Sequence, residues 1–183
     1  PDIILVGEVR DTDTATMAFR AAMTGHQVFT TLHTNSALGA FPRLSDIGIS
    51  PDIMAGNIIG VVAQRLVRVL CPHCKEPVKP TDEQRKILGV KRNEAIQIFK
   101  HKGCKRCNQT GYRGRMAIME LLRIDSDMDS LIARRAHFDE LRNMALEKGF
   151  TTLADDGVRR ILEGYTSIEE AMRVIDLTSR ILN

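Results

Sequence analysis

The sequence predicts an α/β fold that carries a small metal-binding insertion and ends in a helical region. Three observations lead to this fold class. Residues 1–70 alternate strand-like and helix-like segments in the order β-α-β-α-α-β, which is typical of a layered α/β domain. Residues 71–115 hold all four cysteines, and residues 116–183 begin with a strand-like segment and continue as helices. We therefore expect three parts with these boundaries.

The first strand is predicted over residues 3–6, the apolar run Ile-Ile-Leu-Val, which leads into Gly7 and Glu8. A run without polar alternation is typical of a strand buried on both faces in a parallel sheet. A carboxylate at the carboxyl end of such a strand lies where open α/β sheets bind their ligands. An apolar strand followed by an acid is the Walker B arrangement of P-loop nucleoside triphosphatases, in which the acid organises Mg²⁺ or the attacking water.

The partner of that arrangement, the phosphate-loop motif G-x-x-x-x-G-K-[ST], does not occur in the 183 residues. The chain also begins with Pro1 and not with an initiator Met. We therefore expect a fragment that forms the back half of a phosphate-binding domain, separated from its phosphate loop.

The remaining elements of the first part follow from capping and turn residues. Asp11 precedes a helix that ends at Thr24-Gly25, and residues 27–32 form the next strand. Two further helices are predicted over residues 37–46 and from Pro51 to about residue 59, followed by a strand over residues 64–70.

The rest of the chain is predicted to be mainly helical. Thr81 caps a short helix around residues 84–88, and residues 116–122 form a strand that returns to the main body. From Asp127 onward we expect three helical segments separated by Gly149 and Gly164. Residues 167–170, Ser-Ile-Glu-Glu, have the pattern of a capping box.

The four cysteines form two C-x₂-C motifs, Cys71/Cys74 and Cys104/Cys107, separated by 29 residues. Two such turns can bring four thiolates around one tetrahedral zinc ion. Disulfides are the alternative, but a chain without a secretory signal favours a metal. Four sulfur ligands leave no open position on the ion, so the predicted zinc is structural. We expect His73, between the first two cysteines, to point outward.

The candidate catalytic residues are Glu8, His33 and Arg10. The alternative for Glu8 is an acid that only ends a strand or pairs with Arg10. His33 follows the second strand, beside the strand that leads to Glu8, where γ-phosphate sensing needs a hydrogen-bond donor. His26 lies at the opposite end of that strand and should be farther from a nucleotide. Arg10, like Arg20 and Arg65, can offer positive charge to a phosphate or a neighbouring subunit, although a surface ion pair is the favoured interpretation for Arg20.

The charge distribution is uneven. Residues 64–115 carry 14 Lys and Arg against 4 Asp and Glu, a net charge of +10, whereas the rest of the chain carries a net −7. A basic segment of this kind indicates either a surface for an anionic partner or a solvated Lys-rich insertion. With two Tyr, six Phe and no Trp, the chain offers few aromatic platforms for single-stranded nucleic acid. It contains no apolar run near 18 residues, so we expect no membrane span.

Three ordered motifs resemble those of one protein family. Residues 1–11, PDIILVGEVRD, look like the Walker B box of the secretion ATPases that drive type II secretion and type IV pilus assembly. Residues 24–35, TGHQVFTTLHTN, resemble the His box of that family. Residues 64–68, QRLVR, lead into the cysteine motifs and then into residues 111–115, GYRGR, as in the assembly branch of the family. The related retraction motors lack this metal element.

The resemblance implies a partial RecA-like P-loop ATPase core, here represented by residues 1–70, that works as a hexameric ring in the cytoplasm at the inner membrane. It implies ATP and Mg²⁺ as ligands of the intact enzyme, with Glu8 organising Mg²⁺ or water and His33 sensing the nucleotide. The implied partners are further copies of the chain and cytoplasmic domains of inner-membrane secretion or pilus components, without nucleic acid. Hydrolysis by this fragment alone is not expected. The alternative is a zinc-ribbon module that binds nucleic acid, suggested by the basic segment.

Overall fold

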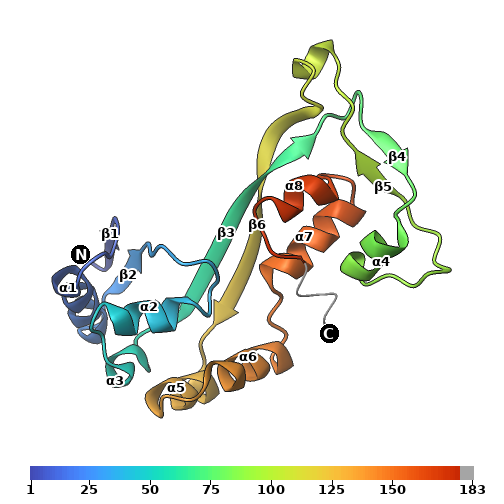
Figure 1. The fold of residues 1–183 in the computed structure, drawn as a ribbon. Helices are drawn as coiled ribbons and strands as arrows, with labels where there is room; N and C mark the ends of the chain where they lie inside the picture. Colours follow the sequence, from blue (N-terminus) through green and yellow to red (C-terminus); the bar gives the residue numbers. More distant parts are fainter. Residues whose placement is uncertain (178–183) are drawn as a thin grey trace. The chain divides into compact units, whose positions relative to one another are not determined.

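The computed structural model describes residues 1–177, which form two compact units (Figure 1). Unit 1 comprises residues 1–63 and 120–150, and unit 2 comprises residues 64–119 and the chain from Thr151 onward. The strands β3 (Gly60–Leu70) and β6 (Tyr112–Arg123) pair with each other, and each contributes residues to both units. Both strands are longer than predicted, because they begin at residues 60 and 112 and not at 64 and 116.

Within the described residues, unit 1 contains a parallel two-stranded sheet, five helices and parts of the strands β3 and β6. The register of the sheet pairs Ile3 with Gln27 and Val6 with Thr30. The elements of the unit, besides parts of β3 and β6, are β1 (Ile3–Val6), α1 (Thr12–Met23), β2 (Gln27–Thr30), α2 (Ala40–Asp46), α3 (Pro51–Met54), α5 (Ser126–Ala133) and α6 (Phe138–Glu147).

Helix α1 is the crossover between the two parallel strands, and its ends confirm the sequence prediction. Asp11 is the N-cap, and its Oδ1 accepts a hydrogen bond from Thr14 N at 2.8 Å. Gly25, with φ of +94°, follows the C-cap in a conformation that favours glycine. The carboxyl ends of β1 and β2 therefore meet at one edge of the sheet.

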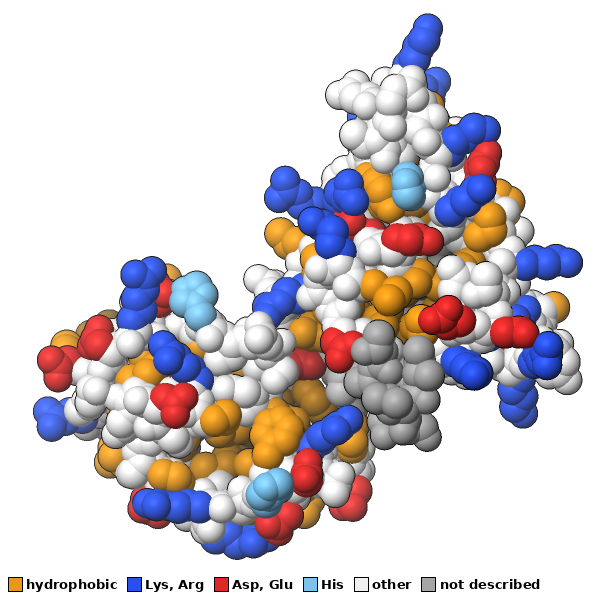
Figure 2. Space-filling model, viewed as in Figure 1, with side chains coloured by type: hydrophobic (Ala, Val, Ile, Leu, Met, Phe, Trp, Pro, Cys, Tyr) orange, Lys and Arg blue, Asp and Glu red, His pale blue; other side chains and the backbone are white. Residues whose placement is uncertain are grey.

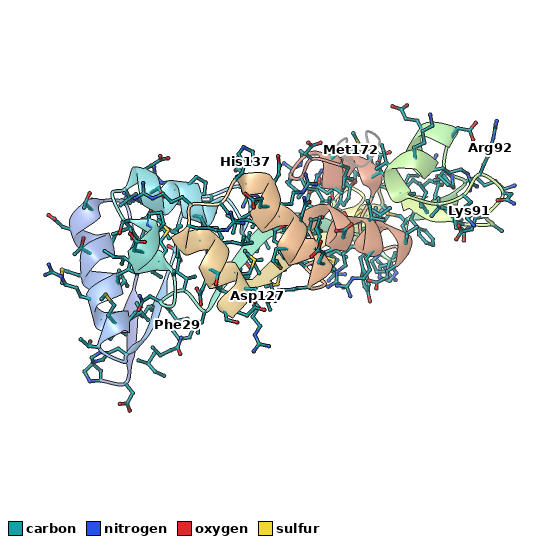
Figure 3. All side chains as sticks on the ribbon, turned by 90° about the horizontal axis from the view of Figure 1, so that it is seen from below. Phe29, Lys91, Arg92, Asp127, His137 and Met172 are labelled. Atoms are coloured by element: carbon teal, nitrogen blue, oxygen red, sulfur yellow. The ribbon has the colours of Figure 1, made fainter. Side chains whose placement is uncertain are left out.

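The expectation that residues 3–6 are buried on both faces is wrong for this chain. Ile3 and Leu5 are 64% and 77% exposed, and Phe29 of β2, labelled in Figure 3, is 53% exposed. Among the described residues β1 pairs with β2 alone, and the exposure of Ile3 and Leu5 shows that no described residue covers their face of the sheet. The apolar sequence of residues 3–6 is typical of an interior strand, but in this chain one face of the strand is exposed.

Two predicted helices are shorter than expected, and one predicted segment is divided. Helix α3 ends at Met54 and not near residue 59, because Ala55 is extended and Gly56 has φ of +75°. Helix α2 begins at residue 40, since residues 35–39 form turns. Arg135, with φ of +57°, separates α5 from α6, so residues 126–177 hold four helices where three helical segments were predicted. A left-handed arginine has no recognisable sequence pattern.

Unit 2 contains a small antiparallel two-stranded sheet in addition to helices. The sheet pairs Glu76 with Lys100, and its strands of three residues each were too short to predict. Thr81 and Gln84 form the capping box of the predicted helix near residue 84. The elements of the unit, besides parts of β3 and β6, are β4 (Glu76–Val78), α4 (Asp82–Leu88), β5 (Ile98–Lys100), the 3₁₀ turn η1 (Lys105–Cys107), α7 (Leu153–Leu162) and α8 (Ile168–Met172).

The predicted capping box at the start of α8 is only half correct. Ser167 is the N-cap, and its Oγ accepts a hydrogen bond from Glu170 N at 3.3 Å. The carboxylate of Glu170 does not return to the cap, because it accepts hydrogen bonds from Arg68 and Arg173 instead. None of the helices in residues 1–177 has the length and apolar character needed to cross a membrane.

Candidate functional site

The first candidate site lies at the carboxyl edge of the β1–β2 sheet. Beyond the two strands, Val9 N donates to Thr31 O at 3.0 Å, and Thr31 Oγ1 donates to Gly7 O at 2.8 Å. These bonds hold the segment that carries Glu8 beside the segment that carries His33. The parallel register of the strands thus brings two residues that are 25 positions apart in the sequence to the same edge.

Glu8, Arg10 and His33 come together at this edge. Glu8 Oε1 lies 2.5 Å from His33 Nε2 and 2.6 Å from Arg10 Nε. The hydrogen bond from Arg10 and, to a lesser degree, that from His33 hold the pKa of Glu8 below its ordinary value, although desolvation opposes them. The Glu8 side chain is 25% exposed, whereas those of Arg10 and His33 are 73% and 80% exposed. The carboxylate is therefore ionised and reachable from solvent.

The surroundings of Glu8 fit a hydrated cation or a bound water. Its ionised carboxylate is partly exposed and lies beside Arg10 and His33. Mg²⁺ binds through one or two carboxylates, and it keeps several of its waters. Glu8 is the residue that would hold such an ion, and His33 is the neighbouring residue that would face an anionic ligand.

Two residues that were expected to lie away from the nucleotide, His26 and Arg20, are not part of the contact between Glu8 and His33. His26 lies at the opposite end of β2, where its Nδ1 is 3.1 Å from both Thr24 Oγ1 and Ala21 O. It thereby ties the end of α1 to the start of β2. Arg20 is exposed on α1, and Arg65, which belongs to unit 2, donates to Gln64 O at 2.9 Å.

The second candidate site is a cluster of the four cysteines in unit 2. All four sulfurs lie within 4.8 Å of one another, and those of Cys71/Cys104, Cys74/Cys107 and Cys104/Cys107 are 3.9, 3.8 and 3.7 Å apart. Sulfurs bound to one tetrahedral zinc at about 2.3 Å lie about 3.8 Å apart. A disulfide requires a distance of about 2.05 Å, so these cysteines are not crosslinked. The cluster fits a four-coordinate metal ion.

Backbone N–H groups and two glycines shape the second half of this cluster. Cys104 N and Gly111 N each lie 3.2 Å from Cys107 Sγ. Burial raises the pKa of this thiol, but these two N–H groups together with hydrogen bonds from the thiols of Cys104 and Cys74 lower it to about 6. At Gly111 an added Cβ would lie 2.6 Å from His101 Cβ, and at Gly103 it would lie 2.7 Å from Gln109 O. Larger residues at either position would displace the loop that carries the ligands.

His73 is exposed, as predicted, and is not part of the cysteine cluster. Its ring lies beside Arg106, with Nη1 3.0 Å from His73 Nδ1. Four sulfur ligands complete a tetrahedral ion, which leaves no position for substrate. The chemistry available here is structural.

A polar network beside the cysteine cluster was missed from the sequence. Tyr112 OH lies 2.8 Å from Ser167 Oγ and 3.2 Å from His101 Nδ1, and the guanidinium of Arg68 lies 4.2 Å from the Tyr112 ring centroid. Arg68 in turn binds the fully buried carboxylate of Glu170. A buried glutamate within a short helix looks like an exposed one in the sequence, so no pattern could have found this network.

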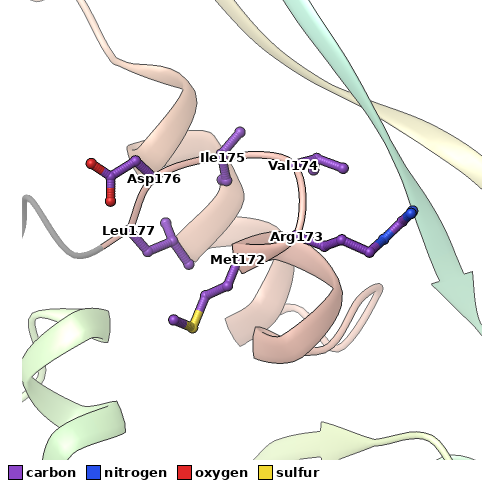
Figure 4. A pocket seen from close by; sticks show the side chains of 6 residues that line it. All are labelled: Met172, Arg173, Val174, Ile175, Asp176 and Leu177. Carbon is purple, nitrogen blue, oxygen red and sulfur yellow. The ribbon is translucent and has the colours of Figure 1, made fainter.

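Two surface hollows add no further cluster of reactive groups. One, of about 290 Å³, is formed by the consecutive residues 172–177 (Figure 4), and the guanidinium of Arg173 that borders it is bound to Glu170. The other, of about 440 Å³ in unit 1, is lined mainly by apolar residues; of its three charged members, Arg123, Asp125 and Lys148, the last two bind each other.

The model of the family described as "Type II/IV secretion system protein" matches residues 1–173. Similar proteins include the type II secretion system ATPase E of Vibrio cholerae, 46% identical over 95% of this chain and 34% of that protein. The type IV pilus assembly ATPase PilB of Thermus thermophilus is 45% identical over 94% of this chain and 20% of that protein. The chain thus spans about a third or less of the length of these curated relatives.

Solved structures of the same fold include the ATPase DotB of Legionella pneumophila and that of Yersinia pseudotuberculosis. Their TM-scores are 0.61 and 0.63, at 22% and 19% sequence identity. Each match covers 95% of this chain, and 38% and 37% of the respective structures. The relatives named here are secretion and pilus ATPases, which does not favour the alternative of a nucleic-acid-binding zinc ribbon.

Proposed function

Because the chain belongs to the type II/IV secretion system protein family, we propose that it is the C-terminal part of a hexameric ATPase that powers type II protein secretion or type IV pilus assembly. The observation that carries this proposal is the contact between Glu8 and His33 at the carboxyl edge of two parallel strands. This is the edge at which α/β proteins bind their ligands. The named ATPase activities of the relatives support the same conclusion.

In the proposed enzyme, residues 1–70 belong to a RecA-like core whose phosphate loop lies outside this chain. Glu8 holds Mg²⁺ or orients the attacking water, because its ionised carboxylate lies at the strand end and is accessible. His33 faces the γ-phosphate through its exposed ring. Arg10 keeps Glu8 ionised and offers positive charge to a phosphate or to the next subunit.

The proposed zinc element, residues 71–115, is a contact surface for a partner and is not part of the hydrolytic site. Residues 116–183 are proposed to form the returning strand and a helical subdomain. Figure 2 shows Lys and Arg side chains around the part of unit 2 that carries β4, β5 and α4. A closed Zn²⁺ site makes this element rigid without taking part in chemistry. Its excess of positive charge suits an acidic cytoplasmic domain of an inner-membrane component, which would place the enzyme in the cytoplasm, peripheral to that membrane.

Steady-state hydrolysis by the intact protein tests the proposed function. We expect His33→Ala to lower turnover while changing ATP affinity little, because a sensor of the γ-phosphate contacts only one part of the ligand. His26→Ala is the matched control, since His26 lies at the other end of the same strand. Equal loss of turnover in both variants, or in neither, would contradict the assignment. The isolated chain should show no turnover, because it lacks the phosphate loop.

A further inference from the structure

The buried carboxylate of Glu120 has no role in the site described above. Glu120 lies on β6 and is 4% exposed. It occupies an inward position of the strand, since Leu122, two residues on, is 1% exposed whereas the intervening Leu121 is 64% exposed. An acidic side chain at a core position is costly unless its oxygens are hydrogen-bonded.

One bond of Glu120 reaches the loop between β2 and α2, which also carries His33. Ala37 N donates to Glu120 Oε1 at 2.5 Å, and Ala37 itself is fully buried. Both residues belong to unit 1. The bond joins positions that are 83 residues apart in the sequence, so no local turn could replace it.

The loop is thereby held at both ends. At its start, Thr31 bonds to the backbone on either side of Glu8, through Gly7 O and Val9 N. At its end, Ala37 N is held by Glu120. Between these points Thr34 Oγ1 donates to Ser36 O, and just beyond the second anchor Gly39 N donates to Ser36 Oγ. His33 lies in the short span between the two anchors, which limits where its exposed ring can go.

We propose that Glu120 is a positioning residue for the nucleotide site: its buried oxygen fixes the end of the 31–37 loop, so that His33 faces Glu8 and the γ-phosphate. This inference rests on the proposed function. On this proposal, holding Ala37 N requires an acceptor oxygen at the position of Glu120 Oε1 and does not require its negative charge. Glutamine keeps that acceptor at the same length, whereas aspartate keeps the charge but is one methylene shorter.

The test measures kcat, KM and thermal unfolding of the intact ATPase. Glu120→Leu should lower kcat by roughly 10- to 100-fold with a smaller effect on KM, because small misplacements of a positioned group are costly. Glu120→Gln should retain most of the turnover, and Glu120→Asp should lose more than Glu120→Gln. A higher kcat for Glu120→Asp than for Glu120→Gln would overturn the inference, since it would mean that the negative charge of the side chain matters and its length does not. That order is informative even if Glu120→Leu fails to fold.

A double-mutant cycle with His33→Ala separates positioning from general damage. If Glu120 acts through His33, Glu120→Leu should have little further effect on kcat in the His33→Ala background. An equal loss in both backgrounds would contradict the inference. Asp156→Leu is the matched control, because it removes a buried carboxylate that accepts from a backbone group, Met119 N, in unit 2. It should lower the unfolding temperature and leave kcat unchanged.

The results distinguish this inference from the proposed function on which it rests. Normal turnover in Glu120→Leu together with impaired turnover in His33→Ala would refute the positioning role alone. Normal turnover in both His33→Ala and Glu8→Gln would refute the proposed nucleotide site itself.

Discussion

Arg68 binds the carboxylate of Glu170 through two nitrogens, with Nε and Nη2 2.9 and 2.6 Å from Oε2. The backbone N–H of Arg68 also donates to Glu170 Oε1 at 3.0 Å, and Arg173 donates to both oxygens. Arg68 precedes the first metal-ligand motif by three residues, and its guanidinium lies over Tyr112, which follows the second motif. This ion pair therefore joins α8 to the strands from which the cysteine loops emerge.

The pH dependence of stability should report the Arg68–Glu170 pair. Burial alone would raise the pKa of Glu170, but the hydrogen bonds from Arg68 and Arg173 lower it from 4.5 to about 2. The pair therefore contributes its full stabilisation above pH 4.5, and this contribution is lost as pH falls toward 2. Glu170→Gln should unfold more easily at pH 7, by about 3 kcal/mol, and should lose this part of the acid dependence.

Urea unfolding at several pH values measures the effect, with Glu140→Gln as the control. Glu140 also pairs with an arginine, Arg134, but its side chain is 47% exposed. An exposed pair contributes at most about 1 kcal/mol, so this variant should change little. Equal destabilisation by the two substitutions would show that burial of the Glu170 carboxylate is not what makes the pair important.

Metal analysis of the purified protein should find about one zinc per chain, bound by four sulfurs. The sulfur distances of 3.7 to 3.9 Å support this expectation. Cys71→Ser should release the metal and increase amide exchange in residues 71–111 more than in unit 1, whose core is built from other residues. His73→Ser is the control and should keep the metal, since His73 is not part of the cluster. Protein prepared without chelator that contains no zinc and four titratable thiols would refute the site.

The sequence predicted those features that depend on short, local patterns. The cap at Asp11, the parallel pairing of β1 with β2, the helix cap at Thr81 and the grouping of the four cysteines all follow from residue types at fixed spacings. The contact between Glu8 and His33 could be predicted in the same way, because the carboxyl ends of two adjacent parallel strands lie at one edge of the sheet.

The remaining features depend on contacts between distant residues. The carboxylates of Glu120 and Glu170 are buried, and their partners lie 83 and 102 positions away. The exposure of Ile3 and Leu5 was missed because an apolar run indicates a preference for burial and not whether a covering layer is present in the chain. The break between α5 and α6 was missed because it occurs at Arg135 and not at a glycine.

Charge reversal should separate partner binding from hydrolysis. Lys105 and Arg106 lie in η1 between Cys104 and Cys107, whereas Lys100 and Lys102 already pair with Glu76 at 3.6 and 2.6 Å. Lys105→Glu with Arg106→Glu should therefore weaken binding to an acidic cytoplasmic domain more than Lys100→Glu with Lys102→Glu. Neither pair should change the ATPase rate of the intact enzyme.

Binding is best measured at low and at high salt, because screening should reduce a contact of this type. Lost hydrolysis with normal partner binding would place the zinc element at the active site or at a subunit interface. That result would overturn its proposed role as a docking surface.

Turnover of the intact enzyme with Glu8→Gln tests the central claim most directly. The substitution keeps the size of the side chain and removes the charge that holds Mg²⁺ or orients water. We therefore expect kcat to fall by roughly 100-fold or more while the Kd for ATP stays nearly unchanged. Asp13→Asn, an exposed change in the first turn of α1, should leave both quantities at their wild-type values. A folded Glu8→Gln enzyme that hydrolyses ATP within about twofold of the wild-type rate would contradict the assignment of this strand edge as the catalytic site.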